Sequence, residues 1–88
     1  MHDVAYTVHT FKEGDTYVAY VPELDLSSCG RTSDDARRNI RDAVTGFLET
    51  SAAMGALVEI LKEAGYKQNE DSWEPPEFVA FGRERATV

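Results

Sequence analysis

Hydrophobic and polar positions alternate over the first part of the chain. Between residues 3 and 11, Val4, Tyr6 and Val8 fall on one face of an extended segment, which is the pattern of a half-buried strand. Residues 16–22 are rich in β-branched and aromatic side chains and end at a proline, which is typical of a second strand. The Lys-Glu-Gly-Asp sequence between the two segments suits a tight turn. The pattern predicts an antiparallel hairpin.

The next segment changes from strand to helical periodicity. Residues 26–30 predict a short third strand, and a helix near residues 33–50 follows. Thr32 and Ser33 each offer a candidate N-cap hydroxyl, and Asp34 and Asp35 place negative charge in the first turn, where the helix dipole favours it. Six apolar residues then recur at spacings that form one stripe of this helix: Ala36, Ile40, Ala43, Val44, Phe47 and Leu48. One face of the helix is therefore expected to pack against the sheet.

The C-terminal third predicts a second helix and a last strand. Gly55 interrupts the first helix, since glycine costs about 1 kcal/mol of helix stability relative to alanine. A shorter helix near residues 55–65 is expected to end at Gly65, and a polar loop follows. Residues 76–82 predict a strand that is apolar on both faces. Such a strand is expected to be covered on two sides, by the helices and by a second subunit or partner.

Together these elements predict a single α+β domain over residues 1–88. Its antiparallel sheet has three to four strands, packed by one long and one shorter helix, in the order β-β-β-α-α-β. A chain of 88 residues buries only a modest fraction of its surface. We therefore expect self-association, to a homodimer or a higher homo-oligomer.

Composition narrows the classes of partner. The chain has 9 Lys and Arg against 16 Asp and Glu, for a net charge of −7. This balance argues against general binding to DNA or RNA and favours a basic protein partner. A single cysteine excludes an internal disulfide. With neither a secretory segment nor an apolar run of about 18 residues, the chain is expected to be cytoplasmic.

Residues able to bind metal are few and poorly spaced. His2, His9 and Cys29 lack the short paired spacings of a zinc site. Asp25, with Asp34 or Glu23, is a candidate carboxylate set for a divalent-metal nuclease. Turn formation and helix capping also explain these acidic residues. With no nucleophile–base pair or phosphate loop, we expect no enzyme activity, no catalytic residue, no metal and no cofactor.

One basic cluster stands out in the acidic chain. It comprises four arginines around the start of the long helix: Arg31, Arg37, Arg38 and Arg41. Arg37 and Arg41 share a helix face, while acidic residues four positions either side of Arg38 partly neutralise the cluster. A solvated helix face is the simpler interpretation, and contact with nucleic acid is the alternative.

The segment from Tyr17 to Leu48 resembles the HicB-like antitoxin family. The similarity lies in a Tyr-Val-Ala-Tyr-Val-Pro-Glu-Leu-Asp strand and turn, a short strand that ends in glycine, and a Thr-x-x-Asp-Ala helix start. It continues along the helix at five residues: Asn39, Ala43, Phe47, Leu48 and Glu49. These are mostly turn and core residues, and the preceding hairpin strand fits as well.

The resemblance implies both a fold and a function. It implies a β-β-β-α-β domain similar to part of the RNase H fold, which binds and neutralises a small basic HicA-type toxin that cleaves mRNA. Within that hypothesis, the expected partner-binding residues are the strand and turn residues Tyr20, Glu23 and Asp25 and the helix-start residues Asp34 and Asp35. This chain is expected to lack the DNA-binding domain that many HicB antitoxins carry. The alternative is an orphan oligomeric module, regulatory or ligand-binding, without a toxin partner.

Overall fold

A computed structural model describes residues 3–88 of the chain. Met1 and His2 lie outside the described residues, and with them the expectation about His2 as a metal ligand. The elements in chain order are β1 (Asp3–Val4), β2 (His9–Glu13), β3 (Thr16–Val21), β4 (Leu26–Gly30), α1 (Ser33–Ala53), α2 (Leu57–Glu63), β5 (Lys67–Asn69) and β6 (Ser72–Glu74). The predicted α+β class, with one long and one shorter helix, is confirmed.

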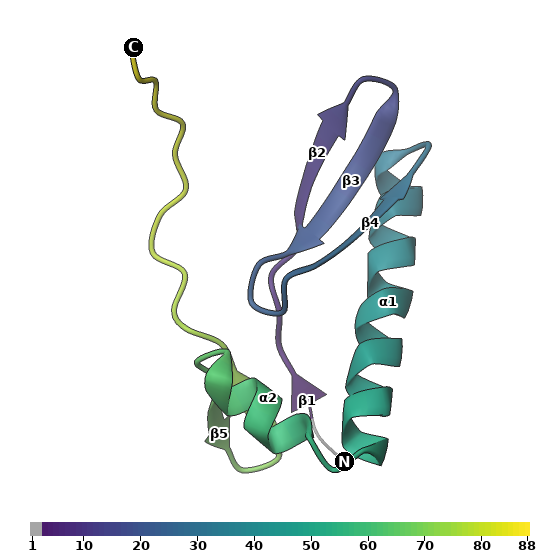
Figure 1. Ribbon diagram of the computed structural model, residues 1–88, viewed down its shortest axis with the longest axis vertical. Helices are drawn as coiled ribbons and strands as arrows, with labels where there is room; N and C mark the ends of the chain where they lie inside the picture. Colours follow the sequence, from purple (N-terminus) through teal and green to yellow (C-terminus); the bar gives the residue numbers. More distant parts are fainter. Residues whose placement is uncertain (1–2) are drawn as a thin grey trace.

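The strands form two three-stranded sheets (Figure 1). The larger sheet has the order β2-β3-β4 with antiparallel neighbours, and the hairpin turn at Gly14 has a φ of 59°, as its composition predicts. The smaller sheet has the order β1-β6-β5, in which β1 and β6 run parallel. In Figure 1, α1 runs beside the larger sheet, while α2 lies with the smaller one.

The first predicted strand divides in two, because its halves pair with different sheets. Val4 pairs with Trp73 in the smaller sheet, whereas His9 pairs with Tyr20 in the larger one. Between them the Thr7 N–H donates to the Glu23 carboxylate at 3.0 Å instead of to a neighbouring strand. The alternation of apolar residues carries no information about this change of sheet.

The predicted strand at residues 76–82 is wrong. Residues 75–88 form an extended segment outside both sheets, which we term the C-terminal arm. Pro75 and Pro76 lack N–H groups, so they cannot extend the hydrogen-bonding of β6. The last strands, β5 and β6, instead form a hairpin where a polar loop was expected.

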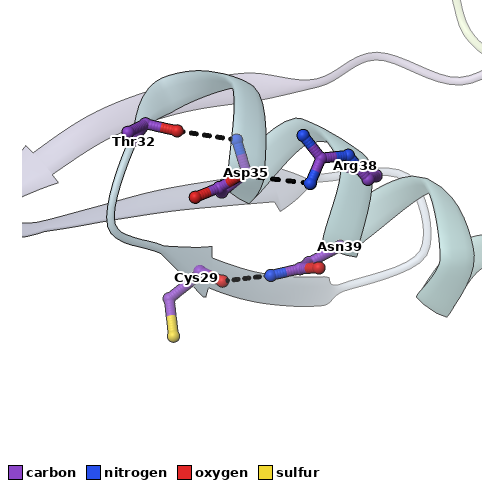
Figure 2. A network of polar contacts seen from close by, with 5 residues as sticks. All are labelled: Cys29, Thr32, Asp35, Arg38 and Asn39. Atoms are coloured by element: carbon purple, nitrogen blue, oxygen red, sulfur yellow. Dashed lines mark hydrogen bonds and ion pairs between the residues drawn. The ribbon is translucent and has the colours of Figure 1, made fainter.

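The start of α1 is fixed to β4 by a short network of polar contacts (Figure 2). The Thr32 hydroxyl accepts a hydrogen bond from the Asp35 N–H at 3.0 Å, so Thr32 is the N-cap of the two candidate residues. One turn further, the Asn39 amide donates to the Cys29 carbonyl at 2.8 Å, and Arg38 pairs with the Asp35 carboxylate at 3.1 Å. The helix is therefore held to the strand that precedes it.

Both helices end at a glycine in the left-handed region. Gly55, with a φ of 72°, separates α1 from α2, as the sequence predicts. Gly65 follows α2 with a φ of 88°. At each end the glycine N–H and the next N–H donate back to carbonyls of the last helical turn, the arrangement of a Schellman cap.

Two hydrophobic clusters make up the core. The first lies between the larger sheet and α1: Ala19, Val21, Ala36, Ile40 and Val44. The second lies between α2 and the smaller sheet: Leu57, Leu61, Tyr66 and Trp73. Leu24 and Leu48 pack against both clusters and so connect them. Ala43, expected on the buried stripe of α1, is exposed.

Candidate interaction surface

The larger sheet has one covered and one open face. Ala19 and Val21 are fully buried beneath α1. Because successive side chains of a strand point to opposite faces, Val18 and Tyr20 lie on the other face. The strand register adds neighbours from β2 and β4, and the outer face comprises His9, Phe11, Glu13, Thr16, Val18, Tyr20, Ser27 and Cys29. We refer to this set as the outer face.

The outer face combines apolar and acidic groups. Phe11 is 45% exposed, and Val18 is half-buried in the same stretch. A shallow hollow of about 570 Å³ lies there, lined among others by Glu13, Val18 and Cys29. At the hairpin end, Glu13 is followed by the exposed Asp15. Such a surface, apolar at the centre with negative charge at its edge, fits a basic protein with apolar contact residues.

Tyr20 and Asp25 form a single polar unit at the opposite end of this face. The Tyr20 hydroxyl donates to the Asp25 carboxylate at 3.0 Å. This hydrogen bond, with smaller contributions from desolvation and the Asp25 charge, raises the pKa of Tyr20 above its ordinary value. Asp25 has a φ of 51°, a conformation that aspartate tolerates better than most residues. The turn thus presents an exposed carboxylate beside an aromatic ring.

Glu23 has an internal structural role. Its carboxylate accepts hydrogen bonds from the Thr7 N–H at 3.0 Å and from the Thr7 hydroxyl at 2.6 Å. The two bonds fasten the β3–β4 turn to the segment that joins the two sheets. Charge reversal at Glu23 is therefore expected to lower stability as well as to affect any partner binding, because the change removes both bonds.

A cleft of about 430 Å³ opens beside Glu23, between the body and the C-terminal arm. Its lining includes Thr7, His9, Pro22, Glu23, Glu77 and Phe78. The His9 ring lies between Tyr20 and Phe81, with ring centroids 6.5 Å and 6.2 Å away. Its Nε2 atom is shielded from solvent and has no hydrogen-bond partner within residues 3–88. One wall of the cleft therefore holds an unsatisfied polar atom.

The acidic helix start lies apart from this region. β4 separates Asp34 and Asp35 from the turn that carries Tyr20 and Asp25, so the five expected binding residues do not form one site. Asp35 pairs with Arg38, and Asp34 lines a groove of about 270 Å³ with three arginines: Arg37, Arg38 and Arg41. The acidic charge at the helix start is thus offset locally by basic charge.

The described part of the chain holds no group of three or more close histidine, cysteine or acidic residues suited to a metal ion. Among the same residues, no helix has the length and apolar character needed to cross a membrane. Comparison with protein-family models, curated proteins and solved structures gave no match. The site is therefore interpreted from its own geometry and chemistry.

Sequence reasoning missed two features of this surface. The first is the exposure of Phe11, which ends the segment predicted as the first strand. The second is His9, which lies in the cleft against the arm. The alternation of residues 9–13 places both on one strand face, and that signal was present. The position of the arm, however, depends on tertiary contacts.

Proposed function

We propose that this chain is a HicB-like antitoxin, which neutralises a small basic mRNA-cleaving toxin of the HicA type by binding it. The observation that carries the proposal is the outer face, an uncovered sheet surface with exposed carboxylates at its edge. Within the described residues, Asp25 takes part in no ion pair. Its charge is therefore free to attract a basic partner.

The outer face supports this proposal better than the helix start. Tyr20 supplies a half-buried aromatic ring and Asp25 an exposed charge, the combination typical of residues at protein interfaces. At the helix start, arginines next to Asp34 and Asp35 repel a basic protein and reduce the gain from the two carboxylates. We therefore place the toxin contact at Tyr20 and Asp25.

The test is co-expression of the chain with the small basic protein encoded beside it, followed by co-purification and binding kinetics. The expected result is a stable complex whose association rate falls as salt is added, because charge attraction is screened over about 10 Å at 0.1 M. Failure of the pair to bind at low salt, or the lack of such a neighbour, would overturn the proposal.

Two matched variants locate the contact. Asp25→Asn keeps the acceptor for Tyr20 and a residue type that tolerates positive φ, but removes the charge. It is expected to weaken binding by up to about fivefold, the equivalent of 1 kcal/mol for an exposed ion pair. Asp34→Asn removes the same charge at the helix start and is expected to leave affinity nearly unchanged. Equal effects of the two variants would contradict the proposed contact.

A further inference from the structure

The apolar side chains of residues 78–81 in the C-terminal arm are exposed to solvent. Phe78 is 59% exposed, Val79 86% and Phe81 80%. Every residue from 76 to 88 is exposed. The radius of gyration is 14.9 Å, against about 12 Å for a compact chain of this length. The arm contributes to this extension, as Figure 1 shows.

The arm begins from a fixed point and then leaves the sheet. A side chain added at Gly65, next to the cap of α2, would lie only 3.0 Å from the Pro76 ring, so the first residues of the arm are closely packed. The backbone hydrogen bond from the Ala5 N–H to the Trp73 carbonyl, at 3.1 Å, is the last one from β6 to the N-terminal segment in the described chain. Beyond it the arm has no strand partner there.

The strand register shows that the arm does not stay paired with the N-terminal segment beside it. Val4 is opposite Trp73, so five further residues on each segment would place His9 opposite Phe78. Instead, Phe81 is the residue whose ring contacts His9, at 6.2 Å. From Trp73 to Phe81 the arm takes eight residues to follow a path that the N-terminal segment covers in five, from Val4 to His9. The cleft of about 430 Å³ lies between the two segments.

β2 offers an open position for a further strand. It pairs with β3 on one edge, and within residues 3–88 its other edge has no partner. Its residues 10–13 are exposed on both faces, so α1 does not cover them. An open edge with a partly apolar face is a template for pairing with another chain. At its first residue, His9 Nε2 provides an unused hydrogen-bonding atom.

We propose that two copies of this chain form a dimer by exchanging their C-terminal arms, each arm lying along β2 and His9 of the other copy. Each copy supplies one apolar arm and one open β2 edge, which is the self-complementarity that a closed two-fold dimer requires. Arg83 and Arg85 follow the apolar residues of the arm, and Glu13 and Asp15 end the receiving strand and begin the turn after it. An exchanged arm that runs in the same direction as β2, as the arm does in Figure 1, places these arginines near the two acidic residues.

The area involved is sufficient for a stable dimer. A phenylalanine buries about 150 Å² when it is covered. The four from two exchanged arms therefore bury about 600 Å², and the surfaces that receive them lose a similar area. The total of about 1,200 Å² reaches the lower limit of stable protein interfaces. Val79 and the exposed Phe11 of the receiving strand add to it.

The first experiment measures molar mass by light scattering on the full chain at micromolar concentration. The expected mass is twice 9.8 kDa. Phe78→Ser combined with Phe81→Ser is expected to yield a monomer with an unchanged circular dichroism spectrum, because neither side chain belongs to a core cluster. The matched control replaces two exposed apolar residues away from the arm, the α1 C-cap Met54 and the α2 residue Val58, as Met54→Ser with Val58→Ser, and is expected to remain dimeric.

A second experiment distinguishes exchange from other dimers. One sample carries a spin label on the native Cys29, and the other is ¹⁵N-labelled with Cys29→Ser. Three strand spacings separate β4 from an arm on β2, about 15 Å. In the mixed sample, the amide signals of Val79 and Phe81 are therefore expected to broaden, because the arm of one copy lies on the sheet of the other.

Four results would overturn the proposal. In light scattering, these are a wild-type monomer, a dimer that the two serine substitutions leave intact, and a series of open oligomers larger than a dimer. In the labelling experiment, it is broadening of the arm signals only when the spin label and the isotope are on the same chain. A monomer whose arm is needed to bind the basic neighbouring protein would assign the arm to that partner instead. Since the isolated chain is measured, failure of toxin binding leaves this proposal unaffected.

Discussion

Replacement of Gly30 by alanine is expected to destabilise the fold through a steric clash at the joint between β4 and α1. A Cβ atom at Gly30 would lie 2.6 Å from the Ala36 nitrogen and 2.7 Å from the Asp35 Cβ, where ordinary contacts measure 3.4–4 Å. The obstructing atoms belong to the first turn of α1, mostly to its backbone, so a rotamer change cannot relieve the clash. The helix start has to move away from β4.

That movement disturbs one hydrogen bond and one packing contact. It strains the 2.8 Å hydrogen bond from Asn39 to the Cys29 carbonyl and shifts Ala36, which is fully buried against the sheet. Overpacking of this kind costs about 1–3 kcal/mol, and a weakened hydrogen bond adds about 1 kcal/mol. We expect a loss of about 2–4 kcal/mol of unfolding free energy. For a domain of this size, that lowers the thermal midpoint by at least about 8 °C.

The control is the same substitution at Gly46, in the interior of α1, where an added Cβ meets no atom within 4 Å beyond the backbone of its own helical turn. Gly46→Ala is expected to stabilise the fold by about 0.5–1 kcal/mol, because alanine favours the helix. Urea unfolding followed by far-ultraviolet circular dichroism measures both changes. If Gly30→Ala is as stable as the wild type, or if both variants shift in the same direction, the steric reasoning is refuted.

Two further predictions concern Glu23 and Tyr66. Glu23→Lys removes both hydrogen bonds to Thr7 and is expected to cost about 2 kcal/mol, so an unchanged melting curve would contradict the structural role given to Glu23. Burial, followed by the charges of Glu23 and Glu74, raises the pKa of Tyr66 to about 12. Folding favours the protonated phenol, so its contribution to the unfolding free energy is complete below pH 10 and is lost as the pH rises through about 12. Tyr66→Phe is expected to reduce the pH dependence of the unfolding free energy between pH 10 and 12. An equally steep decline in the variant would show that the Tyr66 phenol is not its cause.

The sequence predicts the central part of the fold because the local signals there agree with the tertiary contacts. The alternation of β3, the cap at Thr32 and the glycine after α1 all occur where expected. Two of the residues that resemble the HicB-like family, Gly30 and Asn39, join β4 to α1. Their role in this structure is steric and hydrogen-bonding, so they indicate a fold more directly than a reactive site.

The C-terminal third could not be predicted in the same way. The strand β5 consists of Lys67, Gln68 and Asn69, all exposed, and carries no apolar alternation. β6 contributes one apolar residue, Trp73, whose burial against α2 is a tertiary contact. The apolar arm has strand composition, but Pro75 and Pro76 separate it from the ladder. Composition alone does not identify which edge receives a strand.

The candidate surface was predicted only in part. Tyr20 and Asp25 lie together as expected, since a short turn connects them. Asp34 and Asp35 were grouped with them on charge alone, and the length of β4 separates the two sets. Glu23 was assigned to binding, although its carboxylate is used by Thr7. Charge in the sequence indicates a partner's character, but only side-chain contacts show which charges are free.

The most direct test of the proposed function is a titration of RNA cleavage. The small basic protein encoded beside this chain would be incubated with a labelled mRNA at low salt, with increasing amounts of the purified chain. The account predicts that cleavage stops near one equivalent of chain, and that Asp25→Asn requires more protein for the same inhibition while Asp34→Asn does not. Cleavage that continues unchanged in the presence of excess chain would contradict it.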